Sequence, residues 1–92
     1  MLKELMKMVK ALEKVGDIEF DDWGNVYDIT FCDFEDYDEN GNLIMREYEN
    51  KEGVRELQDW LEKNCVSRKG NYIVTYEFDN FDVEMSFTSF DN

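Results

Sequence analysis

Hydrophobic residues recur every three or four positions in two stretches of the chain, which predicts two amphipathic helices at residues 2–15 and 51–64. Gly16 directly follows the first stretch, and a glycine commonly ends a helix. Asn50 precedes the second stretch, where an N-terminal cap is expected. The apolar stripes are Leu2, Leu5, Met6, Val9, Leu12 and Val15 in the first helix, and Val54, Leu57 and Leu61 in the second, with Trp60 at its edge.

Between the helices, the hydrophobic period falls to two residues, which is typical of strands with one buried face. The pattern predicts a short strand at residues 18–20, a turn at 21–25 and a strand over 26–37. A turn at 38–41 contains Asn-Gly, which accepts positive φ, and the next strand covers 43–48. In the strand over 26–37, Tyr27, Ile29 and Phe31 share the apolar face, and Asp28, Thr30 and Cys32 share the other.

The last part of the chain predicts a β-hairpin around a two-residue turn at Asp79 and Asn80. Strict alternation then fixes which residues face one another across the hairpin. The expected apolar pairs are Phe78 with Phe81, Tyr76 with Val83, Val74 with Met85, and Tyr72 with Phe87. The other face carries Thr75, Glu77, Asp82, Glu84 and Ser86.

These elements follow one another in the order α-β-β-β-α-β-β. Strand segments with few helices predict an α+β fold, in which an antiparallel sheet of four to five strands carries two helices on one face. A chain of 92 residues is the size of one domain, so residues 1–92 are expected to form a single acidic α+β domain.

Composition supports a folded protein and argues against an enzyme. The chain is 42% hydrophobic and 15% aromatic, which is sufficient for a core. There is no histidine, the commonest general base and metal ligand, so no catalytic site and no cofactor are expected. The absence of a long apolar run or a secretion signal predicts a cytoplasmic protein with no membrane partner. Cys32 and Cys65 are then expected to be reduced and partly buried.

The net charge of -13 comes from 23 acidic and 10 basic residues, and it is unevenly distributed. Residues 1–16 have a balance of +2, whereas residues 17–92 have a balance of -15. Self-repulsion of this size lowers stability and would also repel a phosphate backbone. We therefore expect no direct binding of nucleic acid, and a basic protein as partner.

One acidic segment matches the spacing of an EF-hand calcium loop. Oxygen ligands at Asp36, Asp38 and Asn40, a glycine at position 6 and Glu47 at position 12 satisfy the pattern. The flanking residues alternate as strands do, and an EF-hand requires helices there. A plain β-turn is the favoured interpretation. Asp36 and Asp38 could also act as an acid–base pair, but a solvated acidic face is the simpler reading.

Acidic residues repeated every second position of a strand form a row on one face. Their spacing is about 6.6 Å, of the same order as that of successive phosphates along a nucleic-acid strand. Facing a cleft rich in Lys and Arg, such rows would gain charge-assisted hydrogen bonds and fast association. The predicted partner-binding residues are Asp33, Glu35, Asp36, Asp38, Glu39, Glu47, Glu49, Glu77, Asp82 and Glu84.

In size, acidity, lack of His and Pro, and one small α+β domain, the chain resembles phage-encoded anti-CRISPR and other DNA-mimic anti-defence proteins. The resemblance covers composition and layout, and these proteins share no motif, so no residue role is carried over. It implies a non-enzymatic inhibitor that occupies the nucleic-acid site of a CRISPR effector or other nuclease in the host cytoplasm. It also raises a homodimer as an alternative to a monomer.

A second class of function fits the same charge. An immunity-type or housekeeping protein would use its acidic surface to bind a basic protein that has no nucleic-acid site. Under either function, the sequence leaves open whether each of the two tryptophans packs in the core or contacts the partner. Trp60 is expected to pack beside Leu57 and Leu61, whereas Trp23 lies in a polar turn and fits either packing or a partner-binding anchor.

Overall fold

The computed structural model describes residues 2–32, 34–46, 48 and 50–88. Within these residues the chain forms two helices and seven strands. The helices are α1 (Leu2–Val15) and α2 (Lys51–Asn64). The strands are β1 (Ile18–Asp22), β2 (Val26–Cys32), β3 (Phe34–Tyr37), β4 (Leu43–Arg46), β5 (Ser67–Lys69), β6 (Val74–Glu77) and β7 (Asp82–Thr88).

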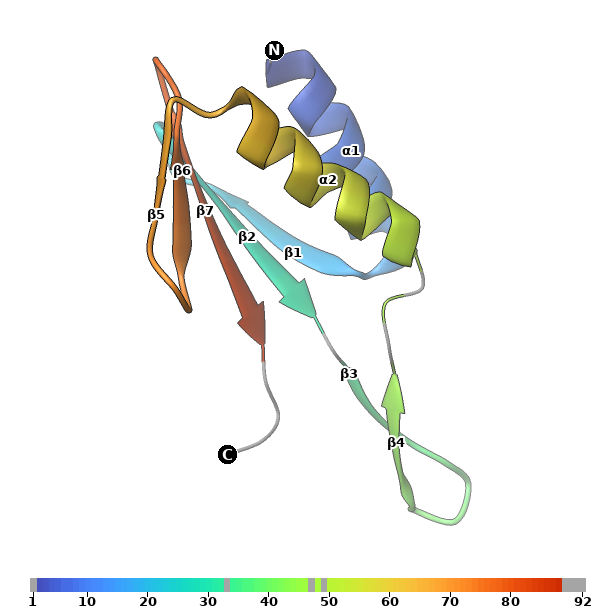
Figure 1. Ribbon diagram of the computed structural model, residues 1–92. Helices are drawn as coiled ribbons and strands as arrows, with labels where there is room; N and C mark the ends of the chain where they lie inside the picture. Colours follow the sequence, from blue (N-terminus) through green and yellow to red (C-terminus); the bar gives the residue numbers. More distant parts are fainter. Residues whose placement is uncertain (1, 33, 47, 49, 89–92) are drawn as a thin grey trace.

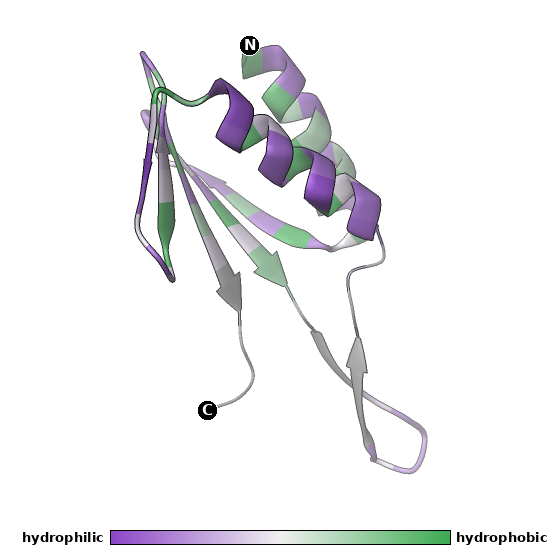
Figure 2. Ribbon diagram, viewed as in Figure 1, coloured by the Kyte–Doolittle hydropathy of each residue, from purple (hydrophilic) through white to green (hydrophobic). Residues whose placement is uncertain are grey.

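The fold has two layers (Figure 1). Five strands form a sheet in the order β1-β2-β7-β6-β5, and both helices cover the same face of it. The core lies between the layers, and the outward faces of the helices are hydrophilic (Figure 2). No described helix or strand covers the second face of the sheet. The expected α+β class and the placement of both helices on one face are confirmed.

The end of α1 follows directly from its sequence. Leu5, Val9 and Leu12 are buried along one stripe, as the spacing predicts. Gly16 then takes a positive φ of 84° and donates to the carbonyl of Glu13 over 3.1 Å. The amide of the next residue, Asp17, donates to the carbonyl of Leu12 over 3.0 Å. This pair of hydrogen bonds is the Schellman motif, which satisfies the last carbonyl groups of a helix.

Asp17 also connects three elements that are distant in sequence. It is only 1% exposed, and its side-chain Oδ2 accepts a hydrogen bond from the amide of Asn50 over 2.8 Å. Its carbonyl accepts from the amide of Cys32 at the end of β2 over 3.0 Å. Asn50 in turn caps α2, because its side chain accepts from the amide of Gly53 over 2.8 Å. Asp17 therefore links the end of α1, the end of β2 and the start of α2.

Aromatic rings pack in a continuous chain at the other end of the sheet. The contacts run from Phe20 to Tyr27, then to Phe81, Phe78 and finally Trp60 on α2. The tightest is the stack of Phe78 on Phe81, with ring centroids 4.7 Å apart. Such contacts add to the free energy gained by burying the rings. They join β1, β2 and the β6–β7 turn to α2.

The prediction of a purely antiparallel sheet is wrong, because β2 and β7 pair in parallel at its centre. The period of two residues shows which residues share a face, but it carries no information on the direction of the neighbouring strand. A parallel pair needs a long crossover connection. Here that connection contains β3, β4, α2, β5 and β6, and α2 crosses over the helix-covered face (Figure 1).

The strand predicted over residues 26–37 is also divided. β2 ends at Cys32, and β3 begins at Phe34 and pairs only with β4. These two strands form a separate antiparallel hairpin, which we call the arm, and it projects away from the sheet (Figure 1). The molecule is elongated as a result, with principal extents of 50 × 26 × 22 Å. The order of elements is therefore α-β-β-β-β-α-β-β-β rather than the predicted one.

The predicted register of the last hairpin is largely confirmed. Val74 pairs with Met85 and Tyr76 with Val83, while the amide of Phe78 donates to the carbonyl of Phe81. The expected pairing of Tyr72 with Phe87 is wrong. Residues 70–73 instead form the loop that joins β5 to β6. The sequence pattern did not predict β5. Tyr72 is 93% exposed in this loop.

The position of Asp17 yields a prediction on stability. Replacing Asp17 by Ala leaves the amide of Asn50 without this acceptor, and loss of such a partly buried hydrogen bond to a carboxylate costs about 2 kcal/mol. Urea unfolding followed by circular dichroism should show this loss. Asp79→Ala removes an exposed acid from a turn and is the control. Equal stabilities of the two variants would contradict the role of Asp17 as a link.

Candidate acidic interface on the open sheet face

Register places acidic residues side by side on the uncovered face of the sheet. The buried residues of each strand, such as Ile29 and Val83, point to the helices, so their neighbours in sequence point the other way. The acidic residues on this second side form a set that we call the acidic sheet face. Its members are Glu19, Asp21, Asp28, Glu77, Asp82 and Glu84.

Three of these residues are direct neighbours across three strands. Asp21 of β1 pairs with Asp28 of β2, and Asp28 pairs with Glu84 of β7. Neighbouring strands lie about 4.8 Å apart, so the three side chains begin at this spacing. Asp82 and Glu77 form a second acidic pair on the adjacent row. Like charges directly opposite one another destabilise a sheet, so this arrangement lowers the stability of the fold.

One lysine lies on the same face. Lys69 of β5 contacts Glu77 with Nζ 2.6 Å from Oε1. The hydrogen bond from Lys69 lowers the pKa of Glu77, and the same bond raises the pKa of Lys69. Among the described residues, Asp21, Asp28, Asp82 and Glu84 make no ion pair with a Lys or Arg side chain. Six acids and one base give the acidic sheet face a net charge of -5.

The structure divides the predicted partner-binding residues between two places. Glu77, Asp82 and Glu84 belong to the acidic sheet face. Asp38 and Glu39 lie at the tip of the arm, away from the end of the sheet that carries Glu77 and Asp82 (Figure 1). Of the others, Glu35 and Asp36 are described only by their backbone in β3, and Asp33, Glu47 and Glu49 lie outside the described residues.

Three acids of the sheet face were not among the predicted residues. Glu19, Asp21 and Asp28 come from β1 and β2. The alternation of the sequence already placed Asp28 on a polar face. It gave no sign that β7 would lie beside β2, which is the contact that brings Asp28 next to Glu84. The order of strands was therefore the missing information.

At the tip of the arm, Asp38 acts as a turn residue. Its Oδ1 accepts from the amides of Asn42 and Asn40 over 2.8 Å and 2.9 Å, and Gly41 has a positive φ of 81°. The hydrogen bond from the Asn42 amide is the main cause that lowers the pKa of Asp38. The loop joins two antiparallel strands, which confirms the predicted β-turn. Calcium ligation through Asp36, Asp38, Asn40 and Glu47 stays the less favoured alternative, since the side chains of Asp36 and Glu47 are not among those that the structure describes.

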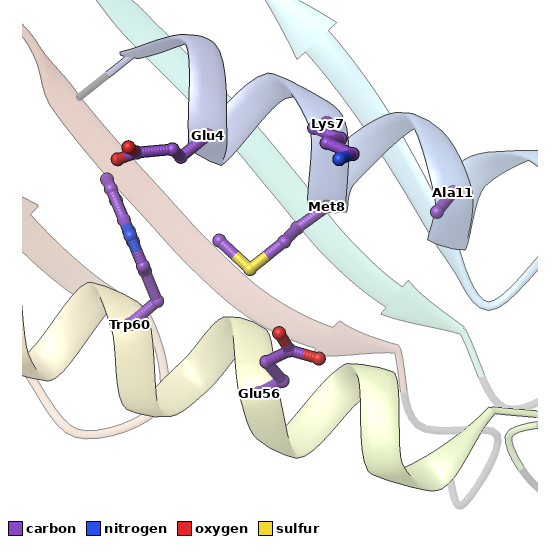
Figure 3. A pocket seen from close by; sticks show the side chains of 6 residues that line it. All are labelled: Glu4, Lys7, Met8, Ala11, Glu56 and Trp60. Atoms are coloured by element: carbon purple, nitrogen blue, oxygen red, sulfur yellow. The ribbon is translucent and has the colours of Figure 1, made fainter.

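A groove between the two helices is a hollow of the surface with partly apolar walls (Figure 3). Its volume is about 510 Å³, within the range of small-molecule sites. Met8 of α1 points toward α2, Trp60 of α2 extends toward the carboxylate of Glu4, and Glu56 lies on the α2 side of Met8 (Figure 3). Lys7 also lines the groove, so its charge is mixed and indicates no particular ligand. Trp60 is held by stacking on Phe78, which fits its predicted structural role.

Other kinds of site find no support within the described part of the chain. No cluster of three His, Cys, Asp or Glu side chains suited to a metal occurs there. Neither helix within the described ranges is long and apolar enough to cross a lipid bilayer. Cys32 is buried and Cys65 half-buried, and no disulfide joins these two thiols, as the sequence predicted.

Comparison with known proteins adds no family to this description. The chain matches no protein-family model, no curated protein and no solved structure. The candidate site therefore rests on its own geometry.

Repulsion within the acidic sheet face predicts a stabilising substitution. Asp28→Thr removes the middle charge of the row and places a residue that favours strands. Relief of about 0.5 kcal/mol would raise Tm by about 2–4 °C in a chain of this size. Scanning calorimetry at low salt and at 1 M salt measures the change. The gain should shrink at high salt, where charges are screened. A lower Tm, or a gain that salt does not change, would contradict the proposed repulsion.

The turn at Asp38 predicts a pH dependence of the arm. Folding lowers the pKa of Asp38, so the ionised carboxylate stabilises the turn. This stabilisation is complete above the ordinary pKa of an aspartate, and it is lost as the pH falls through the lower pKa that Asp38 has in the folded chain. NMR titration of the Asp38 carboxyl carbon, with the amides of Asn40 and Asn42 as reporters, should show one shared midpoint. The reference is the same carboxyl in the urea-unfolded chain. A midpoint equal to that reference would rule out the hydrogen-bonded turn.

Proposed function

We propose that this protein is a non-enzymatic inhibitor that binds the nucleic-acid site of a basic protein, such as a CRISPR effector or another nuclease. The observation that carries the proposal is the acidic sheet face, where six carboxylates share an uncovered surface with one lysine. The surface is on paired strands, so its charges are held in a fixed array before any partner binds.

The charge distribution of the whole fold supports this choice of surface. The lysines of the first 16 residues lie on α1, in the opposite layer of the molecule. A basic partner is therefore attracted to the sheet side, and it associates in a defined orientation. The arm, with Asp38 and Glu39 at its tip, offers a second acidic point that could extend the contact. The proposed setting is the cytoplasm of the host cell.

The alternative is an immunity-type protein that binds a basic partner without a nucleic-acid site. The same acidic surface would serve it, so charge does not separate the two functions. Competition does separate them. Duplex DNA competes for the partner if the acidic sheet face occupies a nucleic-acid site, and has no effect if the contact lies elsewhere.

The test is capture from a host lysate followed by DNA competition and a matched pair of variants. The first variant, Asp28→Asn with Glu84→Gln, neutralises two acids of the acidic sheet face. The control, Glu13→Gln with Asp59→Asn, removes the same charge from exposed positions on the helices. We expect a captured nucleic-acid-binding protein, release by duplex DNA, and about tenfold weaker binding for the first variant only.

Three results would count against the proposal. Captured proteins without a nucleic-acid site would favour the immunity-type function. Indifference to added DNA would exclude occupation of the nucleic-acid site. Equal weakening by both double variants would mean that binding follows net charge and not this face.

A further inference from the structure

Trp23 is a large aromatic residue that the fold leaves in solvent. Its side chain is 72% exposed in the β1–β2 turn, whereas the other tryptophan, Trp60, is half-buried against Phe78. Trp residues are highly buried on average, and they are enriched at the centres of protein interfaces. The exposure of Trp23 therefore marks the β1–β2 turn as a candidate contact site for a partner.

The backbone around Trp23 is fixed by its neighbours. The amide of Trp23 donates to the carbonyl of Val26 over 2.9 Å, and the amide of Gly24 donates to Oδ1 of Asp22 over 2.8 Å. Gly24 has a φ of 88°, which only glycine adopts without strain. A partner that contacts Trp23 would therefore pay little entropy for ordering this turn.

Register places Trp23 at the border of the acidic sheet face. Asp21 pairs with Asp28, and the hydrogen bond to Val26 continues this pairing so that Trp23 lies opposite Val26. Trp23 is two residues beyond Asp21, on the same side of the pleat and about 6.6 Å along the strand. Val26 in turn lies beside Asp82, which belongs to the same face. An exposed indole and several carboxylates thus occupy one end of one surface.

The geometry points to an arginine side chain of the partner as the group that this end of the surface binds. A guanidinium group stacks on an aromatic face, pairs with carboxylates through two parallel hydrogen bonds, and is more weakly hydrated than an ammonium group. Tryptophan is the best aromatic acceptor for such a cation. The inference deepens the proposed function and rests on it, since it names arginine as the chemistry by which the acidic sheet face recognises a basic partner.

Tyr72 provides a matched comparison within the same chain. It is 93% exposed, but it lies in the loop after β5, whose residues include the basic pair Arg68 and Lys69. This loop is at the opposite end of the sheet from the β1–β2 turn (Figure 1). If exposed aromatic area alone determined the affinity for arginine, Trp23 and Tyr72 would contribute equally to binding. If arginine recognition needs neighbouring acids, only Trp23 contributes.

The experiment compares octa-arginine and octa-lysine peptides as probes, because the two carry the same charge. Binding is followed by fluorescence in a Trp60→Phe background, where Trp23 is the one remaining indole and a ring still stacks on Phe78. We expect octa-arginine to change the emission of Trp23 and to bind at least threefold more tightly than octa-lysine. Trp23→Ala, measured by calorimetry, should reduce octa-arginine binding to the octa-lysine level, and Tyr72→Ala should leave the ratio unchanged.

The outcomes separate this inference from the proposed function. A Trp23→Ala variant that keeps the arginine preference, or a Trp23 emission that octa-arginine does not alter, overturns the arginine site. The acidic sheet face still stands in that case if Asp28→Asn with Glu84→Gln weakens both peptides. An apolar partner pocket for Trp23, the other use of an exposed indole, predicts no difference between the peptides. Failure of both peptides to bind counts against the two proposals together.

Discussion

The fold depends on one buried residue, Asp17, because it joins elements that no strand pairing connects. Its amide completes the end of α1, its carbonyl holds Cys32 at the end of β2, and its side chain accepts the amide of Asn50. Among the described residues, the core between the helices and the sheet is built from apolar side chains, and apolar packing is not directional. A directional hydrogen bond at this corner fixes where α2 begins relative to α1.

Because both helices lie on one face of the sheet, they leave the side chains of its other face uncovered. No helix or strand of the described residues lies over the second face of the sheet, so this face carries polar side chains. Neutral residues such as Thr or Ser would satisfy this requirement. The chain instead places Asp21, Asp28 and Glu84 side by side, against the preference of paired strands for unlike charges. A small domain has little stability to spare. Folding therefore does not explain these acids, whereas the proposed contact with a basic partner would explain them.

Local elements could be predicted from the sequence, and their assembly could not. Leu5, Val9 and Leu12 marked α1, Gly16 marked its end, Asn50 capped α2, and alternation gave the register of β6 with β7. Each of these signals depends on residues close in sequence. The parallel contact of β2 with β7 depends on residues some 56 positions apart, such as Asp28 and Glu84, and leaves no mark in either strand alone. For this reason half of the acidic sheet face was missed.

The constraint at Asp17 and the exposed end of the sheet belong to the same hairpin. β1 begins one residue after Asp17, and it runs to Asp22 and the turn that carries Trp23. One end of β1 is thus fixed by the hydrogen bond that the buried Asp17 side chain accepts. The other end is fixed by the contact of Phe20 with Tyr27 and by the hydrogen bonds of the turn. A strand held at both ends presents Asp21 and Trp23 at a fixed separation. Recognition of a planar cation requires such a separation, and a flexible acidic tail of equal charge would not supply it.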